Sequence, residues 1–338
     1  MAQVVERPLW EREVPGSSPG APILIMHAQE KNTFFVLHPA TEFAVVLPSD
    51  GGMACQLPPR YTSSDFSKLV VSVAAENVSV QLATQVCVDG VWSKWYKLGF
   101  ISKKEKYSFE PQTDKIATVS TDELQLFSAA QAYRVQLIFA QHPGEFTVAV
   151  SGVYESFSYD ENDAAQLPSG AYCADITPRS QVETSHPDSR RICSPTSLCM
   201  ALDALEIPVQ LPGVLRGVFD TRANIYGNWI FNTAYACEQG AEAFFRRFSS
   251  LEEMAEFCAP GRFVIASISY EKDELPGAPM AKTDGHLVLI RGWKDGKILV
   301  ADPAAETAAT VLRAYDAEPF ARAWLKNKQG ASYILRKR

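Results

Sequence analysis

The chain has 338 residues, more than the roughly 250 to 300 at which one hydrophobic core usually stops growing, so two domains are expected. Hydrophobic residues make up 46% and charged residues 21%, and no run approaches the roughly 20 apolar residues of a bilayer span, which favours a soluble globular protein with no membrane span. The net charge of -7, without a basic cluster beyond the terminal "RKR", predicts no nucleic-acid partner.

The N-terminal segment, residues 1–19, is predicted to be an extension ahead of the first domain. It lacks the basic start and apolar stretch of a secretory signal, so a cytoplasmic location is the default expectation, and a secreted or cell-surface one holds if a signal has been removed. The seven cysteines are an odd number with no C-x-x-C pair. This pattern argues against a disulfide framework and against a structural zinc site.

Residues 20–160 are predicted to form an antiparallel β-sandwich domain. The stretches 69–88, 132–140 and 145–159 alternate apolar and polar residues and are rich in Val, Phe and Tyr. Turn signals such as Asp89 followed by Gly90 separate these stretches, and no helical pattern interrupts them.

One aromatic stretch of this domain, "VWSKWYKLG", has two interpretations. Trp92, Trp95 and Tyr96 can form a platform for a sugar or a peptide, which would make the domain a binding module with a cell-wall or carbohydrate ligand. They can instead fill the core and edge of the sandwich. Aromatic residues at alternating positions usually pack within sheets, so the core interpretation is favoured.

A linker is predicted over residues 161–170, where acidic residues, Pro and Gly precede a change of pattern. The second domain, 171–338, begins with helices. Apolar residues at helical spacing predict a helix over 194–205, with Pro195 in its first turn. Further helices are predicted over 228–239 and over 249–258, the latter with a capping box.

Strands follow the helices in the predicted order. Residues 262–270, 286–293 and 297–302 have strand patterns, and the "KDG" turn joins the last two as a hairpin. Helices followed by antiparallel strands give an α+β domain.

Cys193 lies just ahead of the predicted helix 194–205. Unpaired N–H groups and the helix dipole favour the thiolate there, which is the form a cysteine nucleophile needs. A buried structural thiol is the commoner role for a cysteine, and position alone favours it.

His286 and Asp302 lie at the far ends of the two hairpin strands. Antiparallel pairing places Asp302 within about two positions of the point opposite His286, where a carboxylate can orient an imidazole toward a thiol. Whether both side chains share one face depends on the register, which the sequence leaves open. A strand histidine with a surface aspartate at the turn is the alternative.

Five stretches of the second domain occur in one order: "QVETSHPDSRRICSPTSLCMAL", "GNWIFNTAYA", "ELPGAP", "GHLVLIRGW" and "VADPAA". Together they resemble the papain-like cysteine peptidases related to bacteriocin-processing (double-glycine leader) peptidases. The bacterial subgroup with an N-terminal β domain fits best, since "WSKWYKLG" and "TVSTDEL" extend the resemblance to the first domain.

The resemblance implies a papain-like domain preceded by a β sandwich, and roles for individual residues. Cys193 matches the nucleophile, His286 the general base, and Asp302 the residue that orients the base. Gln181 matches the glutamine that completes the oxyanion hole with the backbone N–H of the cysteine. Ser194 departs from the glycine usual at this position in leader peptidases, which puts substrate specificity in doubt.

Three residues of "GNWIFNTAYA" are candidates for lining the substrate cleft: Asn228, Trp229 and Asn232. The alternative is that Trp229 packs in the core and the asparagines cap a helix.

The predicted function is a cysteine peptidase or amidase that hydrolyses a peptide or amide bond through a thioester, with a peptide partner and no cofactor. An acyl transferase on the same triad is one alternative, and a non-catalytic binding protein with a relic peptidase fold is another. A zinc site from Cys173, His186 and Cys193 is the third, although the spacing matches no familiar ligand pattern.

Overall fold

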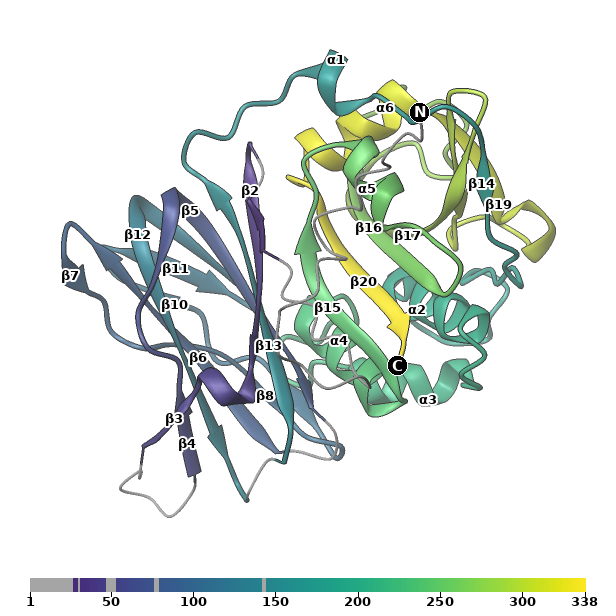
Figure 1. Ribbon diagram of the computed structural model, residues 1–338. Coiled ribbons are helices and arrows are strands. Elements are labelled where there is room, and N and C mark those ends of the chain that lie inside the picture. Colours follow the sequence, from purple (N-terminus) through teal and green to yellow (C-terminus); the bar gives the residue numbers. More distant parts are fainter. Residues whose placement is uncertain (1–26, 30, 47–52, 76–78, 142–143) are drawn as a thin grey trace, which may run out of the picture.

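The computed structural model describes residues 27–29, 31–46, 53–75, 79–141 and 144–338. It contains an all-β sandwich followed by an α+β domain, as the sequence predicted, and the two lie side by side (Figure 1). We keep the predicted boundaries 20–160 and 171–338 as a proposal and call the two parts the β domain and the C-terminal domain. The predicted extension 1–19 and residues 20–26 lie outside the described residues.

The β domain is one antiparallel network with the strand order β1-β2-β13-β5-β12-β6-β8-β9. The long strand β12 pairs with β5 and β11 through its first part and with β6 and β4 through its second part. A short 3-10 turn, η2, follows β2. The strands are β1 (His27–Gln29), β2 (Thr33–Pro39), β3 (Ala44–Val46), β4 (Met53–Gln56), β5 (Arg60–Ala75), β6 (Val80–Val88), β7 (Val91–Trp92), β8 (Tyr96–Ile101), β9 (Lys106–Tyr107), β10 (Gln112–Thr113), β11 (Ala117–Ser120), β12 (Glu123–Phe139) and β13 (Phe146–Tyr154).

The second half of β5 is buried on both faces, so its apolar residues run together instead of alternating. Leu69 and Val71 belong to the sandwich core. Ala74 belongs to the core of the C-terminal domain, and the Ser72 hydroxyl accepts the Phe245 N–H of that domain at 3.0 Å. The part of the sheet that contains β5 therefore packs against the sandwich core on one face and against the C-terminal domain on the other.

A one-turn helix, α1 (Glu161–Ala164), lies within the predicted linker, where the sequence pattern indicated no helix. The Asp160 carboxylate caps it by accepting the Asn162 N–H at 3.0 Å. Glu161 pairs with Arg322 of the C-terminal domain at 2.5 Å. This contact depends on a residue 161 positions away, which local sequence cannot reveal.

The C-terminal domain is built on an antiparallel sheet with the order β15-β20-β16-β17-β18-β19, and β14 adds to β17. Its helices are α2 (Cys193–Ala204), α3 (Leu211–Val218), α4 (Trp229–Glu238), α5 (Leu251–Phe257) and α6 (Ala317–Ala321), with short 3-10 turns η3 (Ser189–Arg191) and η4 (Ala308–Thr310) and a π-helical turn η5 (Arg322–Lys326). Its strands are β14 (Tyr172–Cys173), β15 (Ala241–Arg247), β16 (Arg262–Tyr270), β17 (Thr283–Lys294), β18 (Lys297–Ala301), β19 (Leu312–Asp316) and β20 (Ala331–Lys337).

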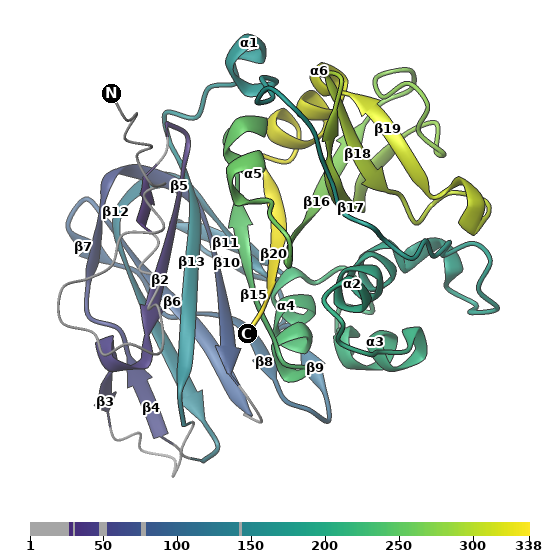
Figure 2. The ribbon, with the colours of Figure 1, turned by 45° about the vertical axis from the view of Figure 1, so that its right-hand side comes forward.

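The predicted helices, the hairpin and the α+β fold are confirmed, although the helices do not all precede the strands, since β14 comes before α2 and α6 follows β19. Strand β15 lies between α4 and α5 and pairs with the C-terminal strand β20 (Figure 2). Its residues Arg246 and Arg247 are buried because Glu253 and Glu123 pair with them. Two charged residues in succession break the alternation of apolar and polar residues that predicts a strand. The glutamates that allow these arginines to be buried come from other elements.

β15 is also the strand of this sheet that faces the β domain, next to β13 (Figure 1). As an edge strand it would leave N–H groups unpaired. The Ser72 hydroxyl accepts the backbone N–H of Phe245, and the Ser151 hydroxyl accepts the backbone N–H of Arg247 at 3.1 Å. The β domain thus provides hydrogen-bond acceptors for N–H groups at the edge of the C-terminal sheet.

Candidate active site

Cys193 is the first residue of α2, and the preceding Ile192 provides no side-chain cap. The Thr196 hydroxyl donates to the Ile192 carbonyl at 2.7 Å, which leaves the N–H groups of the first turn to other acceptors. One of them, the Ser194 N–H, lowers the pKa of the Cys193 thiol, and so does the Leu287 N–H from β17. The thiol therefore sits where the helix terminus and the sheet both offer donors.

His286 and Asp302 form a buried pair, with Nε2 of the ring 2.7 Å from Oδ1 of the carboxylate. Their exposed fractions are 1% and 0%. The Ala304 N–H donates to the same oxygen at 3.0 Å, and the Tyr315 hydroxyl donates to Oδ2 at 2.8 Å. Nε2 of the ring is hydrogen-bonded to Asp302, so the nitrogen that interacts with Cys193 is Nδ1.

The hairpin register brings Asp302 to the face of the sheet that carries His286. A bulge over 290–292 shifts the pairing of β17 and β18, so that Leu289 lies opposite Ala301. One residue further, Asp302 lies opposite position 288, within two positions of the point opposite His286, as the sequence predicted. Positions 286 and 288 share one face because side chains alternate along a strand. Without the bulge Asp302 would point to the other face.

The charges of these three side chains support one another. Burial alone would raise the pKa of the Cys193 thiol, but the hydrogen bond and charge of His286 outweigh burial, and the pKa lies below its ordinary value. Burial would lower the pKa of His286, but the charge of Asp302 raises it above its ordinary range. Burial would raise the pKa of Asp302, but His286 holds it low. The arrangement favours a thiolate beside an imidazolium.

Gln181 is buried, and its place is set by the segment that follows Asp302. Its backbone N–H donates to the Pro303 carbonyl at 2.8 Å, and the neighbouring Ser180 hydroxyl donates to the Ala305 carbonyl at 2.5 Å. Its side-chain oxygen Oε1 has no hydrogen-bond partner among the described residues. This oxygen can only accept a hydrogen bond, whereas an oxyanion needs the N–H donors of the amide, so the oxyanion role of Gln181 stays a prediction.

Of the three residues considered for the substrate cleft, Asn228 and Trp229 have the contacts of the alternative interpretation, whereas Asn232 lies within α4 and does not cap it. Asn228 is the N-cap of α4, with its oxygen accepting the Phe231 N–H at 3.2 Å. The Trp229 ring stacks on Phe245 at 4.8 Å. Asn232 is 0% exposed and accepts the Ser194 hydroxyl at 2.9 Å. The structure therefore brings Asn232 beside the residue that follows Cys193.

Two further residues at the site escaped sequence analysis. Tyr315 on β19 donates to Asp302, and Tyr333 on β20 lies 2.9 Å from the Ser194 hydroxyl through its own hydroxyl. Both are fully buried tyrosines in strands without an obvious pattern. No local signal separates them from ordinary core tyrosines.

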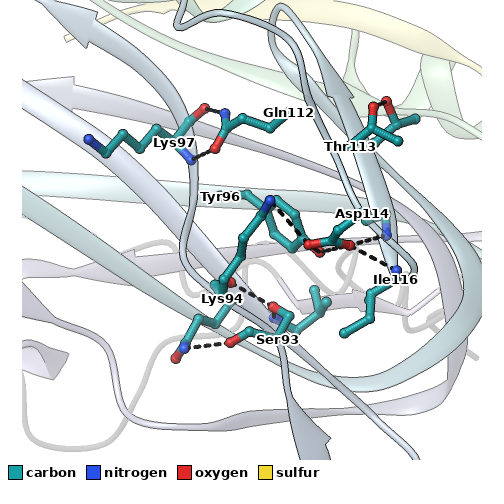
Figure 3. Close-up of polar contacts among 12 residues, drawn as sticks. Ser93, Lys94, Tyr96, Lys97, Gln112, Thr113, Asp114 and Ile116 are labelled. Carbon is teal, nitrogen blue, oxygen red and sulfur yellow. Dashed lines mark hydrogen bonds and ion pairs between the residues drawn. The ribbon is translucent and has the colours of Figure 1, made fainter.

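Of the three aromatic residues in this stretch of the β domain, Tyr96 belongs to the interior, whereas Trp92 and Trp95 are half-buried. Tyr96 is fully buried, and its hydroxyl donates to both oxygens of Asp114 at 2.8 and 2.9 Å (Figure 3). Lys94 pairs with the same carboxylate at 3.2 Å. The Arg134 guanidinium lies over the Trp92 ring, 4.0 Å from its centre. The core interpretation is confirmed for Tyr96, and a carbohydrate ligand on this stretch has no support.

The zinc alternative has no support either. Within the described ranges, no three His, Cys, Asp or Glu side chains group in a way that could hold a metal ion.

No helix in the described part of the chain is long and apolar enough to cross a membrane.

A cysteine at a helix N-terminus beside a buried histidine and carboxylate on an antiparallel sheet defines a papain-like cysteine peptidase. Two family models match the chain. Residues 173–332 match the model described as the Peptidase_C39 like family, and residues 55–156 match the Peptidase C39 N-terminal domain. The region 173–332 is a C39-like peptidase domain, and the protein is a cysteine peptidase.

Solved structures give matches to parts of the chain. A double glycine motif protease from an AMS/PCAT transporter, in complex with its leader peptide, is 19% identical, with 49% of this chain and 95% of that chain covered and a TM-score of 0.36. A putative C39-like peptidase from Bacillus anthracis is 16% identical, with 50% and 98% covered and a TM-score of 0.38. A β-sandwich carbohydrate-binding module is 15% identical, with 36% and 53% covered and a TM-score of 0.17. A search of curated protein sequences returned no significant match.

Proposed function

We propose that the protein hydrolyses a peptide or amide bond through a thioester intermediate on Cys193. The observation that carries the proposal is the buried hydrogen bond between His286 and Asp302, together with the lowering of the Cys193 thiol pKa by His286. His286 acts as the general acid and base, and Asp302 orients its ring. Peptides are the substrate class, in keeping with the family.

In the first half of the reaction the Cys193 thiolate attacks the carbonyl carbon, and the imidazolium of His286 protonates the departing amine. Water then attacks the thioester, with His286 as the base, and the acid product leaves. Negative charge develops on the carbonyl oxygen in both halves. The Gln181 side chain and the Cys193 backbone N–H would stabilise that charge, and one such donor typically contributes about 10²- to 10³-fold in rate.

Alkylation of the native protein tests the nucleophile. Limiting iodoacetamide is applied from pH 5 to 8, and mass spectrometry reads which of the seven cysteines reacts and how fast. Cys193 is expected to react first and well below pH 7, and His286→Ala is expected to abolish this advantage. Cys173 is the internal reference, because it is the exposed thiol.

Equal rates at Cys193 and Cys173, with an ordinary thiol pH profile, would remove the basis of the proposal. If Cys193 is activated, turnover of a peptide mixture with and without an added amine separates hydrolysis from acyl transfer. The Cys193→Ala variant should release no product in either case.

A further inference from the structure

The N-terminal turn of α4 is held by two segments of the β domain. Asp122, at the turn between β11 and β12, accepts the backbone N–H of Trp229, the first residue of α4. Asp220 receives the Asn228 side-chain amide at 3.0 Å and the Ser108 N–H of the β domain at 3.1 Å. The start of α4 is therefore tied to the β domain on both sides.

The same turn of α4 reaches the active site through Asn232. Its side-chain nitrogen donates to the Tyr226 and Asn228 carbonyls, both at 2.8 Å, which fixes the orientation of the amide. The amide oxygen is then turned toward the Ser194 hydroxyl at 2.9 Å. A second partner, the Tyr333 hydroxyl, holds Ser194 from the other side at 2.9 Å.

Ser194 in turn supports the thiolate. Its backbone N–H is one of the donors that lower the pKa of Cys193. A donor helps a thiolate only while it points at the sulfur, since hydrogen bonds weaken steeply as the angle falls. The two bonds to the Ser194 hydroxyl fix the residue that carries this donor.

We infer that the β domain positions the catalytic cysteine, with Asp122 acting through the first turn of α4, Asn232 and Ser194. The inference rests on the proposed function, because it takes Cys193 as the nucleophile. Asp122, Asn232 and Ser194 act as positioning residues through their side chains, since none of these three side chains is assigned a contact with the reacting atoms. The β domain is then a part of the catalytic unit rather than a separate binding module.

The burial of Asp122 adds support. Desolvation raises its pKa to about 6, so near neutral pH a buried carboxylate is kept ionised against that cost. Its oxygens accept the Trp229 N–H and the Thr121 hydroxyl, and no ion pair within 4 Å is recorded for it in the described part of the chain. The neighbouring residue Glu123, by contrast, forms ion pairs with Arg247 of the C-terminal domain and with Lys68 of the β domain. Of the two hydrogen bonds that Asp122 accepts, the one from Trp229 reaches beyond its own turn, to the start of α4.

The test compares pH profiles of Cys193 alkylation in full-length variants. Asp122→Ala removes the acceptor, and Asp122→Asn retains an oxygen that can accept the Trp229 N–H. Asp122→Ala is expected to slow alkylation at pH 6 by about twofold to tenfold, the worth of one hydrogen bond, and Asp122→Asn is expected to restore most of the rate. Glu123→Gln is the control from the same turn and interface, and it should lower the melting temperature without moving the profile.

Ser194→Ala tests the last link and removes only a hydroxyl, so it retains the fold even if Asp122→Ala does not. It should shift the profile in the same direction as Asp122→Ala. The double variant should shift no further than the larger single, because both act through one path. Unshifted profiles in Ser194→Ala, or additive shifts in the double variant, would overturn the inference while an activated Cys193 in the wild type leaves the proposed function standing.

Discussion

Asp302 makes more polar contacts than its position at the end of a hairpin strand would require. Its two oxygens accept from His286, Ala304 and Tyr315, and it is completely buried. A buried carboxylate with this many donors stays ionised, and its charge is what holds His286 in its protonated form. At the scale of single residues, the acidity of the Cys193 thiol depends on Asp302 through His286.

The Asp302→Asn variant is expected to keep the shape of the site and lose its charge. Without the carboxylate, the pKa of His286 falls and that of the Cys193 thiol rises, so alkylation at pH 6 should slow toward the rate of an ordinary thiol. Peptide turnover should fall on the order of a hundredfold to ten-thousandfold at unchanged KM. Stopped assays across pH 5 to 9 measure both effects.

Tyr315→Phe is the matched control, because it removes one donor to Asp302 and keeps the charge. A loss of about tenfold or less is expected from one missing hydrogen bond. If Asp302→Asn costs no more than Tyr315→Phe, the charge of Asp302 has no special part in the reaction.

At the scale of elements, the hairpin of β17 and β18 combines an ordinary turn with an unusual bulge. Asp295 and Gly296 form the two-residue turn, both with positive φ, as the "KDG" pattern predicted. The bulge ends at Gly292, which has a φ of 150° and lies against β14. A Cβ at Gly292 would lie 1.8 Å from the Tyr172 carbonyl oxygen, so only glycine fits.

Gly292→Ala is therefore expected to destabilise the fold on the order of 3 kcal/mol, through backbone strain and the displacement of β14. Gly296→Ala is the control, since a Cβ there meets nothing within 4 Å, and it should cost about 1 kcal/mol from its positive φ alone. Urea unfolding measures both. If the two variants lose the same free energy of unfolding, β14 can move away from position 292 at little cost, and glycine is not required there.

At the scale of the whole molecule, the two domains share their cores. Phe35 and Leu37 of the β domain belong to the cluster that contains α2, and Ile230 and Phe231 of α4 belong to the sandwich core. Across the same boundary, Ser72 accepts the Phe245 N–H and Asp122 accepts the Trp229 N–H. Buried apolar area and satisfied polar groups on both sides make this interface resemble the interior of one domain.

The buried carboxylate of Asp122 makes stability depend on pH. Its pKa is about 6 in the folded protein against an ordinary value of 3.8, so as pH rises past about 4 the unfolded chain ionises first and the free energy of unfolding falls until about pH 6. The cost at neutral pH is on the order of 3 kcal/mol. Asp122→Asn lacks this cost.

The Asn variant is thus expected to match the wild type near pH 4 and to exceed its stability at pH 7 to 8. Chemical unfolding at the two pH values gives the difference. A difference that does not change with pH would show that Asp122 titrates normally.

The sequence alone determined what depends on neighbours along the chain. Helix 194–205 follows from apolar spacing and Pro195, helix 249–258 from its cap at Ser250, and the hairpin from its turn, because caps, periods and turns are local. Cys193, His286 and Asp302 were selected as candidates by the same local features together with the family resemblance.

The tertiary structure decided which face Asp302 presents, because one bulged residue moves every following side chain to the other face of a sheet. It also decided the roles of Tyr315, of the buried Arg247 and of Asp122, whose partners lie 13, 124 and 107 positions away. A buried charge is stable only with its partner, and when that partner is distant in sequence only the folded chain brings the two together.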